Sequence, residues 1–295
     1  MSSNIYTEQG KNIRKTWFLM TTFFVLIVAL GSFISFYYQS SGILYGAILF
    51  SVVMNIASYW YSDKIVLSMH KAKPVTREEY FDLYTVTENI SITAGLPMPR
   101  LYVIEESAPN AFATGRDKEH AVVCVTTGLL ALLDRQELEG VIAHEISHIG
   151  NRDILLSTVV VVLAGFISII SHMFLRTLHI GGNGNNRNGG GALAIVGIVL
   201  ALLAPLGATL IQLAVSRKRE FLADADGALL TRYPEGLARA LEKISGSSVP
   251  MKTANNATAH LFIANPFGKK GGFSKLFMTH PPTEERVRAL LGNNV

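Results

Sequence analysis

The sequence predicts a mainly α-helical membrane protein, with about four transmembrane helices and a cytoplasmic α+β domain that contains a small β-sheet. Hydrophobic residues make up 49% of the 295 residues and charged residues only 16%, whereas soluble chains average about 25% charged residues. Four apolar runs are long enough to cross a bilayer, at about 20 residues per crossing. The segments outside these runs are charged and show both helical and extended patterns, which is typical of a folded α+β domain.

The first two apolar runs predict an amino-terminal transmembrane hairpin within residues 1–73, with spans at about 17–38 and 43–61. A cleaved signal peptide is the alternative for the first run. That run exceeds the usual signal core of about 7–15 residues, however, and no A-x-A-like cleavage site follows it. Lysine and arginine residues precede the first run and follow the second, while the link between the runs is uncharged. Both outer flanks are therefore expected in the cytoplasm.

Residues 74–153 form the first part of the predicted cytoplasmic domain. The glycine and prolines of residues 95–99 end its first helix, and Asp134 and Glu137 have the spacing of a helix capping box. In chain order, this part predicts a helix over 76–94, a strand over 100–105, a hairpin of the runs 110–115 and 121–126, a helix over 128–133, and a longer helix after Asp134.

A second transmembrane hairpin is predicted within residues 154–215, with spans at about 154–175 and 192–215. A link rich in glycine and asparagine joins the two runs. They could instead pack as buried helices of the domain, but their length and lack of charge favour insertion into the membrane. Residues 216–295 complete the cytoplasmic domain, beginning with a charged helix over 216–230 and ending with a short helix over 282–291.

The helix after Asp134 carries the pattern H-E-x-x-H at His144, Glu145 and His148. Residues four apart lie on one helix face, so both imidazoles can bind the same metal ion. Glu145 lies next to them, where it can contact a water molecule on the metal without being a ligand. This arrangement is typical of zinc proteases, in which the glutamate is the general base. The alternative is a chance occurrence of the pattern, against which the helical context counts.

Catalytic zinc sites usually have three protein ligands and a water molecule, so a further ligand is required. Glu220 is the best candidate, and Asp224, one helical turn later, could accept the second N–H of a ligand histidine. The alternative for this pair is an exposed acidic helix face. Two membrane crossings between His148 and Glu220 would return the chain to the same side of the bilayer, as a shared site requires.

The spacing between ligands and membrane runs predicts where the metal lies. Six residues separate His148 from residue 154, which is about 9 Å along a continuous helix. The metal is therefore expected within about two helical turns of the cytoplasmic membrane surface. Such a position favours membrane proteins, or chains presented at the membrane, as substrates.

The net charge of +4 does not indicate a nucleic-acid-binding protein, because no basic stripe with interleaved aromatic residues is present. The positive charges lie beside the apolar runs instead. The single cysteine, Cys124, lies in an extended apolar run and is expected in the core. It has no nearby cysteine or base in the sequence that would make it a zinc ligand or a nucleophile.

The chain contains five short motifs, which are NAFATG at 110–115, TTGL at 126–129, HEISH at 144–148, REFLAD at 219–224 and THPPTEER at 279–286. Together these motifs resemble the HtpX family, which comprises bacterial membrane-integrated zinc endopeptidases related to the CAAX prenyl proteases of eukaryotes. The resemblance extends in order from about residue 6 to residue 291. The layout of four apolar runs fits the HtpX branch, because the prenyl-protease branch has more membrane segments, and prenylated substrates are not expected.

The resemblance implies a zincin-like (gluzincin) catalytic domain with one Zn²⁺ per chain on His144, His148 and Glu220. It implies a multi-pass protein of the bacterial cell inner membrane, with both termini and the active site in the cytoplasm. The implied activity is hydrolysis of misfolded or damaged membrane proteins in stress-related quality control. The implied partners are these protein substrates and the lipid bilayer, without nucleic acid.

The resemblance also assigns roles to residues around the metal. His280 is implied as the donor that stabilises the tetrahedral oxyanion, with Arg286 near it, and Asn110 is implied to grip the substrate backbone. The run 110–115, which includes Ala113 and Thr114, is expected to offer an edge strand. A substrate backbone could pair with such a strand independently of its own sequence.

Two other classes of function compete with the protease. A membrane-anchored zinc-binding scaffold would use the same ligands without turnover and would not need Glu145 as a base. A transporter would use His172, which lies within the third apolar run, but the runs contain almost no charge to line a polar path. Loss of cleavage in a zinc-loaded Glu145→Ala protein would distinguish the protease from the scaffold.

Overall fold

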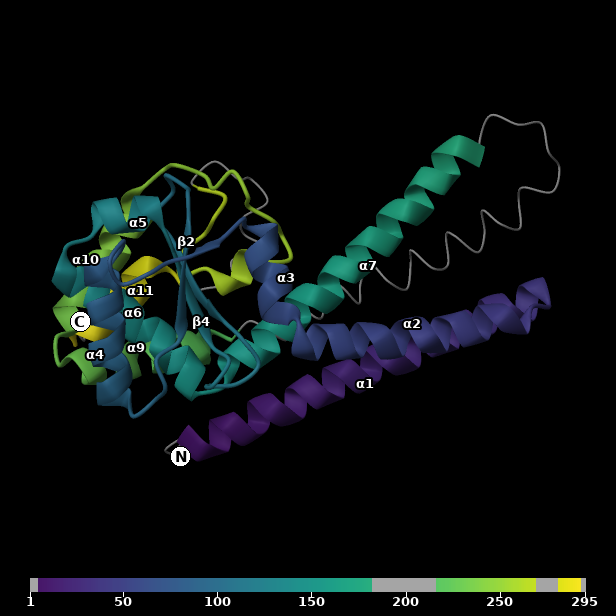
Figure 1. Ribbon diagram of the computed structural model, residues 1–295, viewed down its shortest axis with the longest axis horizontal. Coiled ribbons are helices and arrows are strands. Elements are labelled where there is room, and N and C mark those ends of the chain that lie inside the picture. Colours follow the sequence, from purple (N-terminus) through teal and green to yellow (C-terminus); the bar gives the residue numbers. More distant parts are fainter. Residues whose placement is uncertain (1–4, 182–215, 269–280, 293–295) are drawn as a thin grey trace.

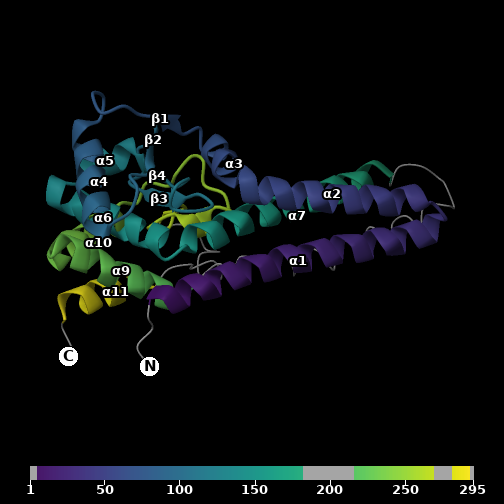
Figure 2. The same cartoon turned by 60° about the horizontal axis from the view of Figure 1, so that its bottom comes forward.

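The computed structural model describes residues 5–181, 216–268 and 281–292. A globular part holds the sheet and the shorter helices, and three long helices project from it in one general direction (Figure 1). These helices are α1 (Ile5–Tyr38), α2 (Ser41–Trp60) and α7 (Asp153–Gly181). The start of α1 and the short helix α11 (Thr283–Leu291) both lie at the globular end (Figure 2).

Two helices are long and apolar enough to cross a membrane, over Gln9–Tyr38 and Ser41–Trp60. They agree with the first two predicted spans. A third crossing arises only if the bent pair Arg135–Gly150 and Asp153–Ile169 is counted as one span. The predicted span over 192–215 lies outside the described residues. The described part of the chain therefore supports two or three of the four predicted crossings, and it does not test the fourth.

The three projecting helices pack against one another through a shared apolar layer. Leu19 and Phe23 of α1, Met54 of α2 and Leu156 of α7 are all buried in it. Large apolar side chains such as Phe36 remain exposed on the outward faces of α1 and α2. Apolar faces of this extent are expected to contact lipid rather than water.

A four-stranded mixed sheet of order β1-β2-β4-β3 forms one layer of the globular part. β1 (Lys73–Pro74) is antiparallel to β2 (Arg100–Ile104), which is parallel to β4 (Val122–Thr126). β4 pairs antiparallel with β3 (Ala111–Thr114), and the predicted hairpin is confirmed. β3 is an edge strand of this sheet and packs against α6 and α7.

Helix α6 (Arg135–Gly150) is the central helix of the globular part, and it carries the H-E-x-x-H pattern. Val141, Ile142 and Ile146 are buried along it, because the sheet and other helices surround it. The other described helices of this part are α3 (Ser62–Met69), α4 (Phe81–Ala94), α5 (Thr127–Leu132), α9 (Arg217–Thr231), α10 (Pro234–Gly246) and a 3₁₀ turn, η1 (Ala259–Leu261).

Local sequence signals explain both ends of α4. Gly95 ends the helix in the left-handed conformation, with φ of 65°, which glycine adopts without steric cost. The predicted start at Thr76 is wrong, because the helix begins only at Phe81. The N–H and the hydroxyl of Thr76 both donate to the Glu79 carboxylate, which holds the preceding residues in a turn instead.

Helix α6 has well-defined ends. Asp134 and Glu137 form the predicted capping box at its start. At the other end Asn151 is the C-cap, Arg152 has a positive φ of 56°, and α7 leaves at 83° to α6. The predicted continuous helical path from His148 to the third apolar run is therefore wrong, and the depth of about 9 Å inferred from it does not apply.

Candidate metal centre

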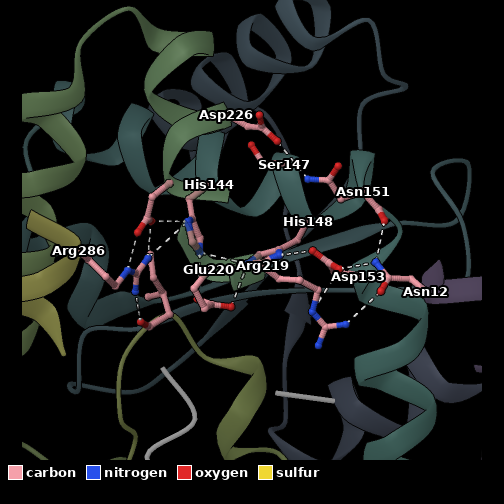
Figure 3. Close-up of polar contacts among 12 residues, drawn as sticks. Asn12, His144, Ser147, His148, Asn151, Asp153, Arg219, Glu220, Asp226 and Arg286 are labelled. Atoms are coloured by element: carbon pink, nitrogen blue, oxygen red, sulfur yellow. Dashed lines mark hydrogen bonds and ion pairs between the residues drawn. The ribbon is translucent and has the colours of Figure 1, made fainter. Parts of the chain in front are cut away.

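Two helices bring three potential metal ligands together. α6 supplies His144 and His148, one turn apart, and the first turn of α9 supplies Glu220 (Figure 3). The Glu220 carboxylate lies 3.8 Å from His144 Nε2 and 3.6 Å from His148 Nε2, and the two Nε2 atoms are 3.2 Å apart. One ligand atom from each residue lies within 4.8 Å of the others. The three predicted ligands therefore converge on one point.

The close approach of α9 to α6 depends on Gly227. A Cβ atom at Gly227 would lie 3.1 Å from the backbone nitrogen of His144 and 3.3 Å from its Cα. These separations are shorter than ordinary packing contacts between heavy atoms, which lie near 3.5–4.0 Å. The absence of a side chain at Gly227 thus lets the two backbones approach where the first ligand is attached.

The buried ion pair of Asp224 and Arg286 contacts the Nδ1 side of the His144 ring, opposite Nε2. Its Nδ1 lies 2.9 Å from Asp224 Oδ1, in line with the prediction for Asp224. Arg286 donates to both oxygens of Asp224 at 2.6 and 2.8 Å and to the Ile263 carbonyl at 3.2 Å. Burial raises the pKa of Asp224, but Arg286 and His144 outweigh it and lower that pKa to about 2. Arg286 thus contacts both Asp224 and the His144 ring, whose Nδ1 lies 3.4 Å from Arg286 Nη2. Its expected neighbour His280 lies outside the described residues.

The His148 ring has a carboxylate partner that was not predicted. Asp153 begins α7, and its Oδ2 lies 3.0 Å from His148 Nδ1. On a continuous helix, residues five apart do not face each other. The break at Asn151 and Arg152 places Asp153 beside the ring. The polar run of these residues between two apolar helices was the available signal for that break.

The donor set fits a catalytic zinc ion. When the Nδ1–H groups donate to Asp224 and Asp153, both rings present an Nε2 lone pair to the shared point. Two imidazole nitrogens and one glutamate oxygen are the protein ligands of one common type of catalytic zinc site, which leaves a further position for water. The sequence motif and the side-chain geometry therefore indicate a metal site at the same three residues.

The two histidines differ in their protonation. Burial lowers the pKa of His144 to about 4. The Asp224 carboxylate raises this pKa, but the positive charges of His148 and Arg286 lower it further. Burial also disfavours protonation of His148, but the hydrogen bond to Asp153 and the surrounding carboxylates outweigh it and raise its pKa to about 9. Because a metal ligand must be the neutral imidazole, metal binding at neutral pH displaces a proton from His148.

Glu145 lies beside the ligands and is buried, with only 2% of its surface exposed. Burial raises the pKa of its carboxyl to about 7, and the charge of Glu220 adds to this effect. The positive charges of His148 and Arg286 and a backbone hydrogen bond from Ala113 act in the opposite direction. A carboxyl that titrates near neutral pH can both accept and return a proton.

A cavity of about 30 Å³ lies between these groups, and it is large enough for a water molecule or an ion. The three ligands, Glu145 and Ala113 line it. His260 from the 3₁₀ turn η1 also lines it, with Nε2 3.3 Å from the Ser157 carbonyl. No sequence motif pointed to His260, because a short 3₁₀ turn has no periodicity that marks one face.

One residue of the edge strand β3, Ala113, lines this cavity. The Asn110 carbonyl accepts from the Thr126 N–H on β4 at 3.0 Å. By alternation, Ala111 and Ala113 direct their peptide groups away from β4. The Ala111 carbonyl accepts from the Ile263 N–H at 3.0 Å, so the chain itself covers that end of the edge. Of the predicted edge strand, Ala113 is therefore the position where a substrate backbone could pair, and this residue lines the cavity.

Two residues expected near a substrate make internal contacts instead. The side chain of Asn110 donates to the Ala264 carbonyl at 3.0 Å and accepts from the Ala264 N–H at 3.2 Å. The Thr114 hydroxyl pairs with the hydroxyl of Thr158 on α7 at 2.9 Å. Both side chains are buried. They therefore hold the neighbouring segments against β3 and are not available to grip a substrate backbone.

Comparison with known proteins identifies similar sequences along the whole chain. Residues 79–294 match the model of Peptidase family M48. A protein described as "Protease HtpX homolog" from Thermoanaerobacter pseudethanolicus is 48% identical over 293 residues, which cover 97% of this chain and 97% of that protein. Another with the same description, from Caldanaerobacter subterraneus subsp. tengcongensis, is 47% identical over 293 residues with the same coverage of both chains.

A solved structure is also similar. The crystal structure of S. mikatae Ste24p matches with a TM-score of 0.50 and 21% sequence identity. The match covers 95% of this chain and 65% of that chain. At this level of identity the similarity concerns the fold alone.

Proposed function

Because this chain belongs to peptidase family M48, we propose that it is a zinc-dependent endopeptidase acting on misfolded or damaged membrane proteins at the cytoplasmic face of the bacterial inner membrane. The family, the relatives and the apolar helices already make it a membrane-bound metallopeptidase. The main support for the finer proposal is the buried cluster of His144, His148 and Glu220, with Glu145 beside it. A zinc-binding scaffold would not need that additional carboxyl.

Three residues would hold the zinc ion, His144, His148 and Glu220. When bound, zinc would polarise the substrate carbonyl and lower the pKa of the attacking water to about 7. Asp224 and Asp153 would keep the two rings turned so that each Nε2 faces the ion. This support matters because small displacements of ligands strongly reduce metal binding and activity.

Glu145 would transfer the proton of the reaction. Its carboxylate accepts a proton from the water molecule whose oxygen adds to the peptide carbonyl carbon. The same carboxyl then donates that proton to the amine nitrogen as the C–N bond breaks. Burial of Glu145 favours its protonated form, which a nearby zinc ion would oppose, so the carboxyl could hold the proton between the two steps and release it to the amine.

The substrate backbone would bind beside Ala113. Ala113 lines the cavity, and its peptide groups point away from β4. Its N–H donates to Glu145, so an extended chain would pair with its carbonyl. Main-chain pairing does not depend on the substrate sequence, which suits a protease that removes many different damaged proteins. His280 is carried over from the family resemblance as the donor to the oxyanion.

Charge distribution supports a cytoplasmic position for the globular part. Lys11, Arg14 and Lys15 lie near the start of α1, and Lys64 and Lys71 follow α2. Both ends of this helical hairpin lie on the globular side (Figure 1). Positively charged flanks remain in the cytoplasm during membrane insertion. The projecting helices would then keep the metal centre close to membrane-protein substrates.

Exchange of Glu145 for glutamine tests catalysis separately from metal binding. In detergent, wild type and Glu145→Gln are each expected to contain one zinc ion per chain by metal analysis. Cleavage of a membrane-protein substrate is expected to fall about 10²–10⁴-fold in the variant, the usual contribution of a general base. Glu105→Gln is the matched control, because it removes only an exposed pair with Lys73, and it should cleave like wild type.

The same assays give outcomes that would contradict each part of the proposal. His148→Ala is expected to lose both zinc and cleavage. A zinc-loaded Glu145→Gln protein that cleaves at the wild-type rate would refute the role of Glu145. Cleavage by zinc-free wild-type protein would refute the requirement for zinc. Equal cleavage of membrane proteins and of soluble unfolded proteins would argue against the proposed substrate class.

A further inference from the structure

The first turns of α1 dock against the corner between α6 and α7. Gln9 Nε2 donates to the Gly150 carbonyl at 2.6 Å. Asn12 Nδ2 donates to the Asn151 carbonyl at 3.2 Å and to Asp153 Oδ1 at 2.7 Å. Asn12 comes from α1 and lies directly beside Asp153 (Figure 3). The segment that leads into the first membrane span is thus in contact with the corner that carries the partner of a zinc ligand.

Asn12 links the corner between α6 and α7 to the start of α9 through its two amide atoms. On one side, Asp153 accepts from Asn12 through Oδ1 and faces His148 Nδ1 through Oδ2 at 3.0 Å. On the other side, Asn12 Oδ1 accepts from Arg219 Nη1 at 3.3 Å. Arg219 precedes the ligand Glu220, and its Nε lies 3.5 Å from Asp153 Oδ1. These contacts form a closed set behind the metal site.

The set is buried, which makes its geometry energetically important. Asn12 is 2% exposed, Asp153 4% and Arg219 7%. A buried donor or acceptor that loses its partner remains desolvated without compensation. The neutral amide of Asn12 donates to a carboxylate on one side and accepts from a guanidinium on the other, and an ionised carboxylate at this position would have no donor. An aspartate at position 12 would place a second carboxylate against Asp153.

We propose that Asn12 is a positioning residue of the zinc centre. Through Asp153 it fixes the orientation of the His148 ring, and through Arg219 it fixes the start of α9, where Glu220 is attached. The amino-terminal membrane helix is therefore part of the metal site as well as an anchor. This inference rests on the proposed zinc-dependent function.

Gln9 provides a matched control for this role. It lies one helical turn before Asn12, docks on the same corner and makes a short hydrogen bond. Its partner is the backbone carbonyl of Gly150, and it contacts neither Asp153 nor Arg219 in any described hydrogen bond. If α1 only anchors the corner, Gln9→Ala and Asn12→Ala should behave alike. If Asn12 positions the ligands, only Asn12→Ala should change metal binding.

The test measures zinc affinity of full-length protein in detergent by competition with a chromophoric chelator. Asn12→Ala is expected to weaken zinc binding about tenfold or more, the usual effect of losing support behind a ligand. Asn12→Asp should weaken it further, because two carboxylates then oppose each other. Gln9→Ala should bind zinc like wild type. The unfolding temperature of the zinc-free proteins shows whether the Asn12 and Gln9 variants are equally stable without metal.

Two further readouts identify the route of the effect. Co²⁺ in place of zinc should give an altered visible absorption spectrum in Asn12→Ala and an unchanged one in Gln9→Ala, because this spectrum reports ligand geometry. In a double-mutant cycle, the losses of zinc affinity in Asn12→Ala and Asp153→Asn should be less than additive, because both act on His148 and only the contact of Asn12 with Arg219 is separate. Independent, additive losses would overturn the route through Asp153.

Wild-type zinc affinity and an unchanged Co²⁺ spectrum in Asn12→Ala, alongside an active wild type, would overturn this inference alone. A wild type that neither binds zinc nor cleaves would overturn the proposed function and this inference with it. Should Asn12→Ala not accumulate as folded protein, Asn12→Ser, which keeps one hydrogen-bond donor, takes its place in the same comparison with Gln9→Ala.

Discussion

At the scale of single residues, Arg286 is buried next to His144, one of the three proposed metal ligands. A buried guanidinium is tolerated only where charges and hydrogen bonds compensate for the loss of water. Asp224 supplies two such bonds and the Ile263 carbonyl a third. The same Asp224 accepts from His144, so the arginine and the ligand share one carboxylate.

Removal of this arginine is predicted to destabilise the protein and the site together. Arg286→Met leaves Asp224 buried with one partner fewer, and loss of one member of a buried ion pair typically costs about 3–5 kcal/mol. The free energy of unfolding in detergent should fall by about that amount. Zinc affinity should fall as well. Arg288→Met, on the same helix but exposed, is the control and should leave both quantities unchanged.

An equal stability of Arg286→Met and Arg288→Met would contradict this account. It would mean that Asp224 keeps its orientation through His144 alone.

The sequence predicted the residues of the site that have local patterns. His144, Glu145 and His148 follow a fixed spacing, and Glu220 and Asp224 are one helical turn apart on another helix. The remaining contacts lack such a pattern. Asp153 reaches His148 only because the helix breaks, and the partners Asn12 and Asp153 are 141 positions apart in sequence. Contacts across that distance depend on the packing of whole helices, which a single sequence does not show.

At the scale of elements, the crossing of α6 and α9 brings the ligands together. Gly227 lies at the point of closest approach to His144. A change of Gly227 to alanine would affect the stability of the helix and the geometry of the site in opposite directions. Alanine is favoured over glycine inside a helix by about 1 kcal/mol, whereas its methyl group would push the two helices apart.

Gly227→Ala is therefore predicted to reduce zinc affinity. The new Cβ lies 3.1 Å from the His144 backbone nitrogen, so α9 must shift by a few tenths of an ångström and move Glu220 away from the histidines. We expect zinc affinity, measured by chelator competition, to fall about tenfold. Gly246→Ala at the end of α10, where no atom lies within 4 Å of the added Cβ, should bind zinc like wild type. A more stable Gly227→Ala protein with unchanged zinc affinity would show that a methyl group fits between α6 and α9 without displacing Glu220.

Elements with strong local signals agreed with the sequence prediction. The capping box at Asp134 and the glycine after α4 each place an element boundary within a residue. The break between α6 and α7 was not predicted, because Asn151 and Arg152 can continue a helix on propensity alone. Packing of α7 against α1 and α2 favours the bend over a straight helix, and that interaction is long-range.

At the scale of the whole molecule, the helical hairpin of α1 and α2 points away from the metal centre. The link between these helices, around Gln39 and Ser40, lies at the far end from the globular part (Figure 1). If the globular part is cytoplasmic, this link must lie on the opposite side of the membrane. The orientation was predicted from flanking charges alone, and the fold does not contradict it.

Cysteine labelling is predicted to report this orientation directly. The native Cys124 is fully buried and should not react in folded protein. In spheroplasts, a membrane-impermeant maleimide should label Ser40→Cys but not Glu242→Cys, and after lysis it should label both. Both positions are exposed. Labelling of Glu242→Cys alone in intact spheroplasts would show that the globular part lies outside, and wild type measures the background from Cys124.

The contact between Arg286 and Asp224 also has a consequence for how the protein is made. Arg286 follows His144 by 142 positions, and it follows both helices of the amino-terminal hairpin by a longer stretch of chain. A nascent chain that has not reached position 286 therefore lacks the guanidinium that contacts Asp224 beside His144. The buried contacts around His144 are completed only after α1 and α2 have been synthesised. Such an order would keep the site incomplete until the hairpin is available to hold the protein at the bilayer.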